Sequence, residues 1–337
     1  METSPTAEYL LGDVLLLEGG VLEDARLAYA TWGTLNAAGD NCIVFPTYYT
    51  GNHDSNARLI GPGRALDPAR WFIVVPNLFG NGLSSSPSRA APGQRGPDFP
   101  RITVQDNVRC QYALLQQLGV RRVALALGWS MGALQAYQWA ISHGDYVARL
   151  LPICGAARCA PHNRVFIEGV SAALRADQAF AEGRYSTPPR AGLKAFGRVY
   201  AGWAYSQTFF REGLYRTLGY PDIESFLIAW EEEHLVWDAN DLLAKLWTWA
   251  HADPAREFGG DLAAAMARIS ARTIVMPGSQ DLYFTLEDNR AEAALVRGAE
   301  LRPIHSPYGH CAGAPNRFPR ETAFIEHTIR ELLATPA

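Results

Sequence analysis

One stretch near the middle of the 337-residue chain constrains its fold more than any other. An apolar run at residues 122–127 leads into the pattern Gly128-x-Ser130-x-Gly132, and a helix-compatible run follows over residues 132–140. A serine placed between a buried strand and a helix is typical of a nucleophile held in a tight turn. Such a turn strains the serine backbone and brings strand and helix together, so it needs small residues on both sides. The stretch predicts a strand, a strained turn at Ser130 and a helix, with an ordinary Gly/Ser turn as the alternative.

Other apolar runs of strand length occur on both sides of this stretch. Because they alternate with helix-like segments, they indicate an α/β fold with a mostly parallel, doubly wound sheet covered by helices on both faces. Two short runs around Gly19 and Gly20 predict an antiparallel hairpin. The predicted strands are 14–17, 25–30, 41–46, 71–76, 122–127, 150–155, 273–277 and 300–305, and the predicted helices include 103–119 and 319–333.

The pattern changes between residues 160 and 256. Strand-like runs are absent from this stretch of the sequence, whereas aromatic and small side chains are frequent. The chain length and a hydrophobic content of 48% suit one large core with an insertion. We therefore predict a core domain from residues 1–159 and 257–337 and a helical lid inserted at 160–256. The lid aromatics are expected to pack its helices and to cover an apolar pocket.

A serine hydroxyl is a weak nucleophile, so Ser130 needs a base within hydrogen-bond reach and an acid that orients this base. In open parallel sheets, functional groups gather at the carboxyl ends of the strands. Asp281 follows the predicted strand 273–277, and His310 follows the predicted strand 300–305. We predict Ser130 as nucleophile, His310 as base and Asp281 as acid, in the Ser, Asp, His chain order of α/β-hydrolases.

Two of these roles have alternatives in the sequence. His305 is the second candidate base, although it lies inside a predicted strand, where its side chain would pack beside the sheet. Asp288 is the second candidate acid, although it falls in the next predicted helix. Either of the favoured residues, Asp281 and His310, would otherwise be a structural loop residue.

A tetrahedral intermediate on Ser130 would carry a negative charge that needs preorganised donors. The backbone N–H of Met131, at the start of the helix, is the first expected donor, and the helix dipole supports it. The second should come from the loop after the strand 41–46, where Tyr49 is the first choice and Tyr48 the second. The two tyrosine side chains could instead simply form a wall of the pocket.

Composition and motifs exclude several other functions. The net charge is −4 and no basic run is present, so we expect no nucleic-acid partner. No apolar stretch reaches the ~18–20 residues of a membrane span, and residues 1–5 do not resemble a secretory signal, so we expect a cytoplasmic protein. The five cysteines show no paired spacing and are expected to be free thiols, not nucleophiles. No metal, dinucleotide or P-loop motif is present, and no cofactor is predicted.

Several segments resemble the homoserine O-acetyltransferase family of the α/β-hydrolase superfamily. They are 59–67, 99–106, 128–132 and 308–310, and residues 177–185 resemble the start of that family's helical lid. The resemblance extends over most of the chain. It implies the α/β-hydrolase fold, a Ser130–His310–Asp281 triad, an acyl-enzyme and a homodimer built through the lid.

The chain departs from the acetyltransferases at positions that bear on the substrate. Cys311 stands where they usually carry an aspartate after the catalytic histidine, which contacts the substrate amine, and Trp129 stands where a small residue is common. Both are expected to line the substrate pocket with Tyr48. The segments 128–132 and 281–284 look closer to the acetyl-ester hydrolase branch of the family.

The resulting expectation is a serine-dependent hydrolase of small, acetyl-type esters. The alternative is an O-acetyltransferase that moves an acetyl group from acetyl-CoA to homoserine or another small alcohol. In both, the partner is a small-molecule ester or acyl donor. A binding protein without turnover, and an enzyme that uses the pocket without an acyl-enzyme, are the remaining alternatives.

Overall fold

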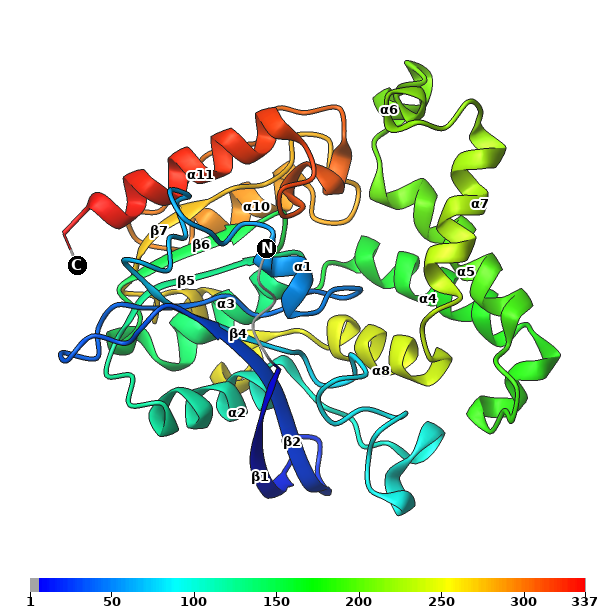
Figure 1. Cartoon of the computed structure of the whole chain (residues 1–337), viewed down its shortest axis with the longest axis horizontal. Coiled ribbons are helices and arrows are strands. Elements are labelled where there is room, and N and C mark those ends of the chain that lie inside the picture. Colours follow the sequence, from blue (N-terminus) through cyan, green and yellow to red (C-terminus); the bar gives the residue numbers. More distant parts are fainter. Residues whose placement is uncertain (1–5, 337) are drawn as a thin grey trace.

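The computed structural model describes residues 6–336, and over this range the strands form one sheet of eight (Figure 1). Residues 1–5, on which the expectation about a secretory signal depends, lie outside the described residues. The strands are β1 (Ala7–Leu15), β2 (Val21–Trp32), β3 (Cys42–Val44), β4 (Phe72–Pro76), β5 (Val123–Trp129), β6 (Arg149–Ile153), β7 (Arg272–Val275) and β8 (Glu300–Leu301).

Helices separate most of the strands from one another along the chain. Before the inserted region these helices are α1 (His53–Ala57), α2 (Val104–Gln117) and α3 (Met131–Ser142). The following helices are α4 (Pro161–Arg175), α5 (Arg190–Ala204), α6 (Gln207–Arg211), α7 (Ile223–His234), α8 (Ala239–Ala250), α9 (Leu262–Met266), α10 (Leu286–Ala293) and α11 (Pro319–Ala334).

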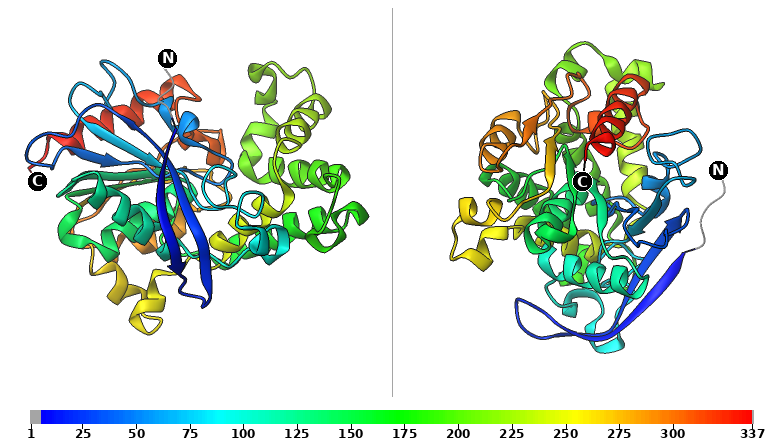
Figure 2. Two further views of the ribbon diagram at one scale, coloured as in Figure 1. Left: turned by 60° about the horizontal axis from the view of Figure 1, so that its bottom comes forward. Right: turned by 90° about the vertical axis from the view of Figure 1, so that its left-hand side faces the viewer.

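The sheet has the order β1-β2-β4-β3-β5-β6-β7-β8. Strands β3 to β8 pair in parallel, whereas β1 pairs with β2 and β2 with β4 in antiparallel fashion. The β1–β2 hairpin projects from the sheet (Figure 2). The mostly parallel, doubly wound sheet and the N-terminal hairpin predicted from the sequence are therefore confirmed.

Two hydrophobic cores cover the two faces of the sheet. Side chains alternate along β5, so that Ala126 faces the core with α2 and α3, while Leu125 and Leu127 face the core with α11. Helix α2 begins at a capping box in which Thr103 and Asp106 satisfy each other's backbone N–H groups. The helix start predicted at Thr103 is confirmed.

The last strand is shorter than the sequence predicted. The pattern indicated a strand over 300–305, whereas β8 ends at Leu301 and an isolated bridge joins Ile304 to Gly278. Backbone hydrogen bonds from Arg302 to Val275 and from Ile304 to Pro277 still hold this segment beside β7, but without regular strand pairing. His305 is consequently exposed outside the strand instead of packing beside the sheet.

Residues 160–256 contain helices α4 to α8 with short 3-10 turns and, within that described range, no strand. Helices α4 to α7 lie together beside the sheet in Figure 1, and α4 packs on α5, which packs on α7. The division into a core and a lid domain stays a prediction.

In the part of the chain that the structure describes, no helix is both long and apolar enough to span a membrane. A cytoplasmic location stays a prediction.

Candidate active site

Ser130 lies at the turn between β5 and α3 in a backbone conformation that L-residues rarely adopt, with φ 59° and ψ −126°. The two glycines around it have no space for a side chain. A Cβ on Gly128 would lie 2.1 Å from the carbonyl of Gly132, and a Cβ on Gly132 would lie 2.6 Å from the carbonyl oxygen of Pro46. Close approach of strand, helix and the β3 loop thus requires both glycines and holds the serine in a strained conformation.

His310 and Asp281 form a buried hydrogen-bonded pair at neighbouring strand ends. The Nδ1–H of His310 donates to Oδ2 of Asp281 over 2.8 Å. The other carboxylate oxygen accepts the backbone N–H groups of Tyr283 at 2.8 Å and Phe284 at 3.2 Å. Because the carboxylate fixes the proton on Nδ1, the unprotonated Nε2 of a neutral His310 is left as the acceptor.

Aromatic rings fix the orientation of the His310 imidazole. Trp129 stacks on it with ring centroids 5.0 Å apart, and Tyr283 meets it edge-on at 4.8 Å. The indole Nε1–H of Trp129 also donates to the carbonyl oxygen of His310 over 3.2 Å. The residue before Ser130 therefore contacts both the ring and the backbone of the histidine.

Ser130 and His310 line one small pocket of about 150 Å³. Tyr48, Tyr49, Trp129 and Cys311 also line it, so the sequence-predicted pocket residues are brought together there. Tyr200 of α5 and Trp230 of α7, from the region predicted to be a lid, also line the pocket. Within residues 6–336 the Ser130 hydroxyl has no hydrogen-bond partner, which leaves it free to approach a ligand or His310.

The two backbone N–H groups expected to bind an oxyanion, those of Tyr49 and Met131, are available as hydrogen-bond donors. Neither the N–H of Tyr49 nor that of Met131 has an acceptor among residues 6–336. The Tyr49 side chain points away from solvent, and its hydroxyl donates to the carbonyl oxygen of Leu242 on α8 over 3.1 Å. The Tyr48 ring instead meets Trp129 edge-on at 4.4 Å, as a wall of the pocket.

Cys311 is buried beside the pocket and is a neutral thiol near pH 7. Burial raises the pKa of its thiol to about 11, against a smaller opposite effect of the nearby Arg317 guanidinium. Arg317 itself donates to the hydroxyl of Tyr205 over 2.9 Å. Cys311 therefore contributes no negative charge to the pocket near pH 7.

Three charged residues of this pocket were not predicted from the sequence. Arg58, Glu233 and Arg317 line it, and all three side chains are exposed. They come from three separate regions of the chain, and no local pattern distinguishes them from ordinary surface residues. Only the tertiary structure brings them together.

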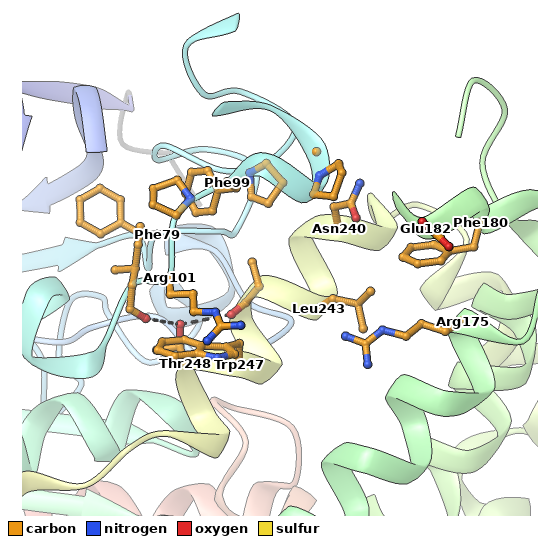
Figure 3. A pocket seen from close by; sticks show the side chains of 16 residues that line it. Phe79, Phe99, Arg101, Arg175, Phe180, Glu182, Asn240, Leu243, Trp247 and Thr248 are labelled. Atoms are coloured by element: carbon orange, nitrogen blue, oxygen red, sulfur yellow. Dashed lines mark hydrogen bonds between the residues drawn. The ribbon is translucent and has the colours of Figure 1, made fainter. Parts of the chain in front are cut away.

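A second hollow, of about 490 Å³, lies against α8, which does not line the pocket at Ser130 (Figure 3). Phe79, Phe99 and Trp247 form apolar parts of its wall, and the Arg101 guanidinium lies 5.5 Å from the centroid of the Trp247 ring. Although it is the larger of the two, it contains none of Ser130, Asp281 and His310. The smaller pocket is therefore the candidate active site.

Residues 6–336 contain no group of three or more His, Cys, Asp or Glu side chains placed to hold a metal ion. All five cysteines are free, and four of them are buried.

A strained serine after a central parallel strand, beside a histidine–carboxylate pair from two later strand ends, is the site architecture of the α/β hydrolase class. A family model described as "alpha/beta hydrolase fold" matches residues 43–312. The chain belongs to this family, and it is an enzyme.

Three relatives indicate which members of this family the chain is similar to. The chain is 37% identical to an ethyl acetate hydrolase of Pseudomonas veronii, in a match that covers 97% of this chain and 95% of the relative. A probable esterase of Corynebacterium glutamicum is 40% identical over 89% of this chain and 88% of its own length. A homoserine O-acetyltransferase of Thermobifida fusca is 33% identical, with coverage of 96% and 92%.

The solved structure of an acetylester hydrolase from Corynebacterium glutamicum superposes with a TM-score of 0.95. It is 38% identical, and the match covers 98% of this chain and 96% of the other. The chain is thus similar to acetyl-ester hydrolases and, at lower identity, to homoserine O-acetyltransferases. The resemblance stated from the sequence is confirmed.

Proposed function

We propose that the protein is a serine-dependent hydrolase of small, acetyl-type esters. The observation that carries this proposal is that His310, which pairs with Asp281 over 2.8 Å, lines one small pocket together with the strained Ser130. The pocket volume of about 150 Å³ favours a small acyl group. The likeness to relatives named as ethyl acetate hydrolase and acetylester hydrolase supports the acetyl specificity.

In the first half-reaction, Ser130 Oγ attacks the ester carbonyl carbon and His310 Nε2 accepts the hydroxyl proton. Asp281 holds the ring and stabilises the imidazolium that forms. The N–H groups of Tyr49 and Met131 donate to the oxyanion, which is worth about 2.7–4 kcal/mol of barrier per donor. The carbon–oxygen bond to the alcohol then breaks, the alcohol takes the proton from His310, and an acetyl ester of Ser130 remains.

In the second half-reaction, water attacks the acyl-enzyme. His310 accepts one proton from this water, and the second tetrahedral intermediate uses the same donors. His310 then returns this proton to Ser130 Oγ as the acyl–oxygen bond breaks, and the product leaves as acetic acid, which ionises to acetate in solution. Water prevails over an amino alcohol in this proposal because the neutral Cys311 offers no carboxylate to a substrate ammonium. An amino alcohol would therefore bind weakly as acyl acceptor.

The acetyltransferase is the second candidate, and the 33% identity to a homoserine O-acetyltransferase favours it. One experiment separates the two. Purified enzyme is incubated with ethyl acetate and p-nitrophenyl acetate, and separately with acetyl-CoA and L-homoserine, with Ser130→Ala as the control.

We expect ester hydrolysis that disappears in the Ser130→Ala variant, with a fluorophosphonate probe labelling only the wild type. Turnover restricted to the mixture of acetyl-CoA and homoserine would instead favour the transferase. Ester turnover that persists in Ser130→Ala would contradict the acyl-enzyme mechanism.

A further inference from the structure

The sequence contains only two lysines, Lys194 and Lys245, and their surroundings are opposite. Lys194 lies on α5 with 41% of its side chain exposed and pairs with Glu231 over 3.0 Å. Lys245 lies on α8 and is completely buried, and within residues 6–336 its Nζ has no hydrogen-bond partner. Burying an amine without a hydrogen-bond partner costs free energy of folding, so the other contacts of Lys245 bear on why it is there.

Two aromatic rings are the direct neighbours of the Lys245 amine. Its Nζ lies 4.1 Å from the centroid of the Trp237 ring and 5.1 Å from that of the Tyr49 ring. Both distances are within the range of a cation–π contact, which can stabilise a desolvated cation. The lysine therefore contacts Tyr49, which lines the active-site pocket, although Lys245 itself does not line it.

The charged groups around Lys245 are engaged elsewhere. Asp241, one turn earlier on α8, accepts the N–H of Ser88 at 2.9 Å and its hydroxyl at 2.7 Å. Asp238 caps α8 and accepts the hydroxyl of Tyr185 at 2.6 Å. His234 of α7 directs its Nδ1 at the Trp230 carbonyl oxygen, 2.8 Å away.

Neither Asp241 nor Asp238 forms an ion pair with the amine, and both influence it only through their charge. The charge of Lys245 contributes to lowering the pKa of His234, after the larger effect of burial. Burial lowers the pKa of Lys245 to about 7, while the charge of Asp241 opposes this shift. Burial also raises the pKa of Asp241 to about 6, although the hydrogen bonds from Ser88 oppose this. The amine thus changes charge in the neutral range.

Helix α8 holds Tyr49 at two points. The Tyr49 hydroxyl donates to the Leu242 carbonyl oxygen at 3.1 Å, and the face of the ring contacts Lys245. The loop after β4 leaves room for the lysine, since a Cβ on Gly80 would lie 3.1 Å from Lys245 Cγ. The backbone N–H of the same tyrosine is the second oxyanion donor of the proposed mechanism.

We propose that Lys245 is a positioning residue: through the Tyr49 ring it holds the Tyr49 backbone N–H in the orientation that binds the oxyanion. The inference rests on the proposed function. Lys245 touches no substrate and exchanges no proton with it. Because only the protonated amine attracts the ring strongly, this support is strongest at low pH and weakens as Lys245 loses its proton.

The first test compares Lys245→Met, which keeps an unbranched side chain of similar length, with Lys194→Met as the matched control. We expect Lys245→Met to lower kcat and kcat/KM together by roughly tenfold with little change in KM, since the lost interaction acts in the transition state. The variant should unfold at the same or a higher temperature, because it removes a buried unpaired amine. The control should match the wild type.

A pH profile separates positioning from a purely structural role. The ratio of wild-type to Lys245→Met kcat should fall as pH rises through the range in which Lys245 loses its proton. A ratio independent of pH, or a variant with wild-type kcat throughout, would overturn the proposal.

The second test needs no variant and does not depend on the natural substrate. Enzyme labelled with ¹³Cε-lysine should give two side-chain resonances, with Lys194 as the internal reference. A fluorophosphonate on Ser130 places an oxygen in the oxyanion hole, and by linkage it should shift the Lys245 titration but not that of Lys194. A wild type that the probe does not label would refute the proposed function, whereas labelling with an unchanged Lys245 titration would refute this inference alone.

Discussion

Trp129 donates its indole N–H to the carbonyl oxygen of His310 over 3.2 Å and stacks on the imidazole at 5.0 Å. The two residues are far apart in the sequence, and one of them directly precedes Ser130. The contact therefore ties the turn that carries the serine to the loop that carries the histidine. It gives the tryptophan a role in aligning the site in addition to forming a wall of the pocket.

Trp129→Phe should keep the stacking but lose the donor. We expect a loss of stability of about 1 kcal/mol and a fall in kcat of up to about tenfold, because the histidine loop is held less firmly. Trp139→Phe is the matched control, since its indole N–H donates to Gln111 at 2.9 Å in the core. It should lose similar stability without the fall in kcat, and equal kcat losses in both variants would contradict the alignment role.

Gly132→Ala should damage both folding and activity. The new Cβ would lie 2.6 Å from the Pro46 carbonyl oxygen, so α3 would have to move away from the β3 loop that carries Tyr49. We expect a loss of about 1–3 kcal/mol in unfolding free energy, measured by urea denaturation, with a fall in kcat.

Gly169→Ala provides the comparison for Gly132→Ala. Gly169 lies inside α4, where an added Cβ would meet no other atom within 4 Å, and an alanine there should stabilise the helix by about 0.5–1 kcal/mol. A Gly132→Ala enzyme as stable and active as Gly169→Ala would show that the close approach is not required.

Asp281→Asn should leave the loop intact but misdirect the histidine. The Asn carbonyl oxygen can still accept the N–H groups of Tyr283 and Phe284, so the amide NH₂ faces His310 Nδ1 and favours the wrong tautomer. We expect kcat to fall by roughly 10⁴-fold with an unchanged melting temperature. Steady-state kinetics and calorimetry check this, and a loss below about tenfold would argue against the acid role.

Glu292 should make the stability of the fold depend on pH. Burial raises the pKa of Glu292 to about 7, although its bonds from the Ala157 and Arg158 N–H groups oppose this. The folded state therefore binds more protons than the unfolded state between pH about 4.5 and about 7, and this contribution to stability is lost as pH rises through that window. Within this window the unfolding free energy should fall by at most ~1.4 kcal/mol per pH unit because of Glu292.

Urea unfolding across this pH range measures the Glu292 effect. Glu292→Gln cannot titrate, so its unfolding free energy should lack the same part of the slope. Identical slopes in wild type and variant would assign the pH dependence to other groups.

The predicted homodimer through the lid can be tested at exposed apolar side chains. Val165 of α4 is 63% exposed and Val199 of α5 is 37% exposed, although both are apolar. If the lid forms the interface, Val165→Asp and Val199→Asp should yield monomers in light scattering. Leu10→Asp on β1, where the leucine is 67% exposed, is the control that should remain dimeric. A monomeric wild type would refute the prediction.

Local sequence patterns predicted the structure correctly where it depends on residues that are close together in the chain. The glycines around Ser130, the capping box at Thr103 and the apolar strands each follow from residues a few positions apart, and the structure confirms them. The strand predicted at 300–305 is longer than the observed one, because residues 302–305 bond to the β7 segment without the regular pairing of a strand. Strand ends depend on a partner strand that the sequence does not identify.

The sequence analysis did not single out Lys245, because its contacts, like the ends of strands, depend on segments that are distant in the chain. A signal was present, since it is one of two lysines and has Leu242, Leu246 and Trp249 around it at helical spacing. That spacing indicates a buried helix face, but it does not say which distant ring the amine would meet. The charged pocket residues Arg58, Glu233 and Arg317 show no comparable pattern in the sequence.

The sequence by itself determined the fold class, the strained serine turn and the chain order of Ser130, Asp281 and His310. These depend on steric limits, hydrophobic periodicity and the rule that parallel strands end at one edge of the sheet. Only the tertiary structure decided that the His310 ring meets Asp281 and Trp129, and that the Lys245 amine meets the Tyr49 ring. Such contacts join segments far apart in the chain, and their distances follow from how the whole core packs.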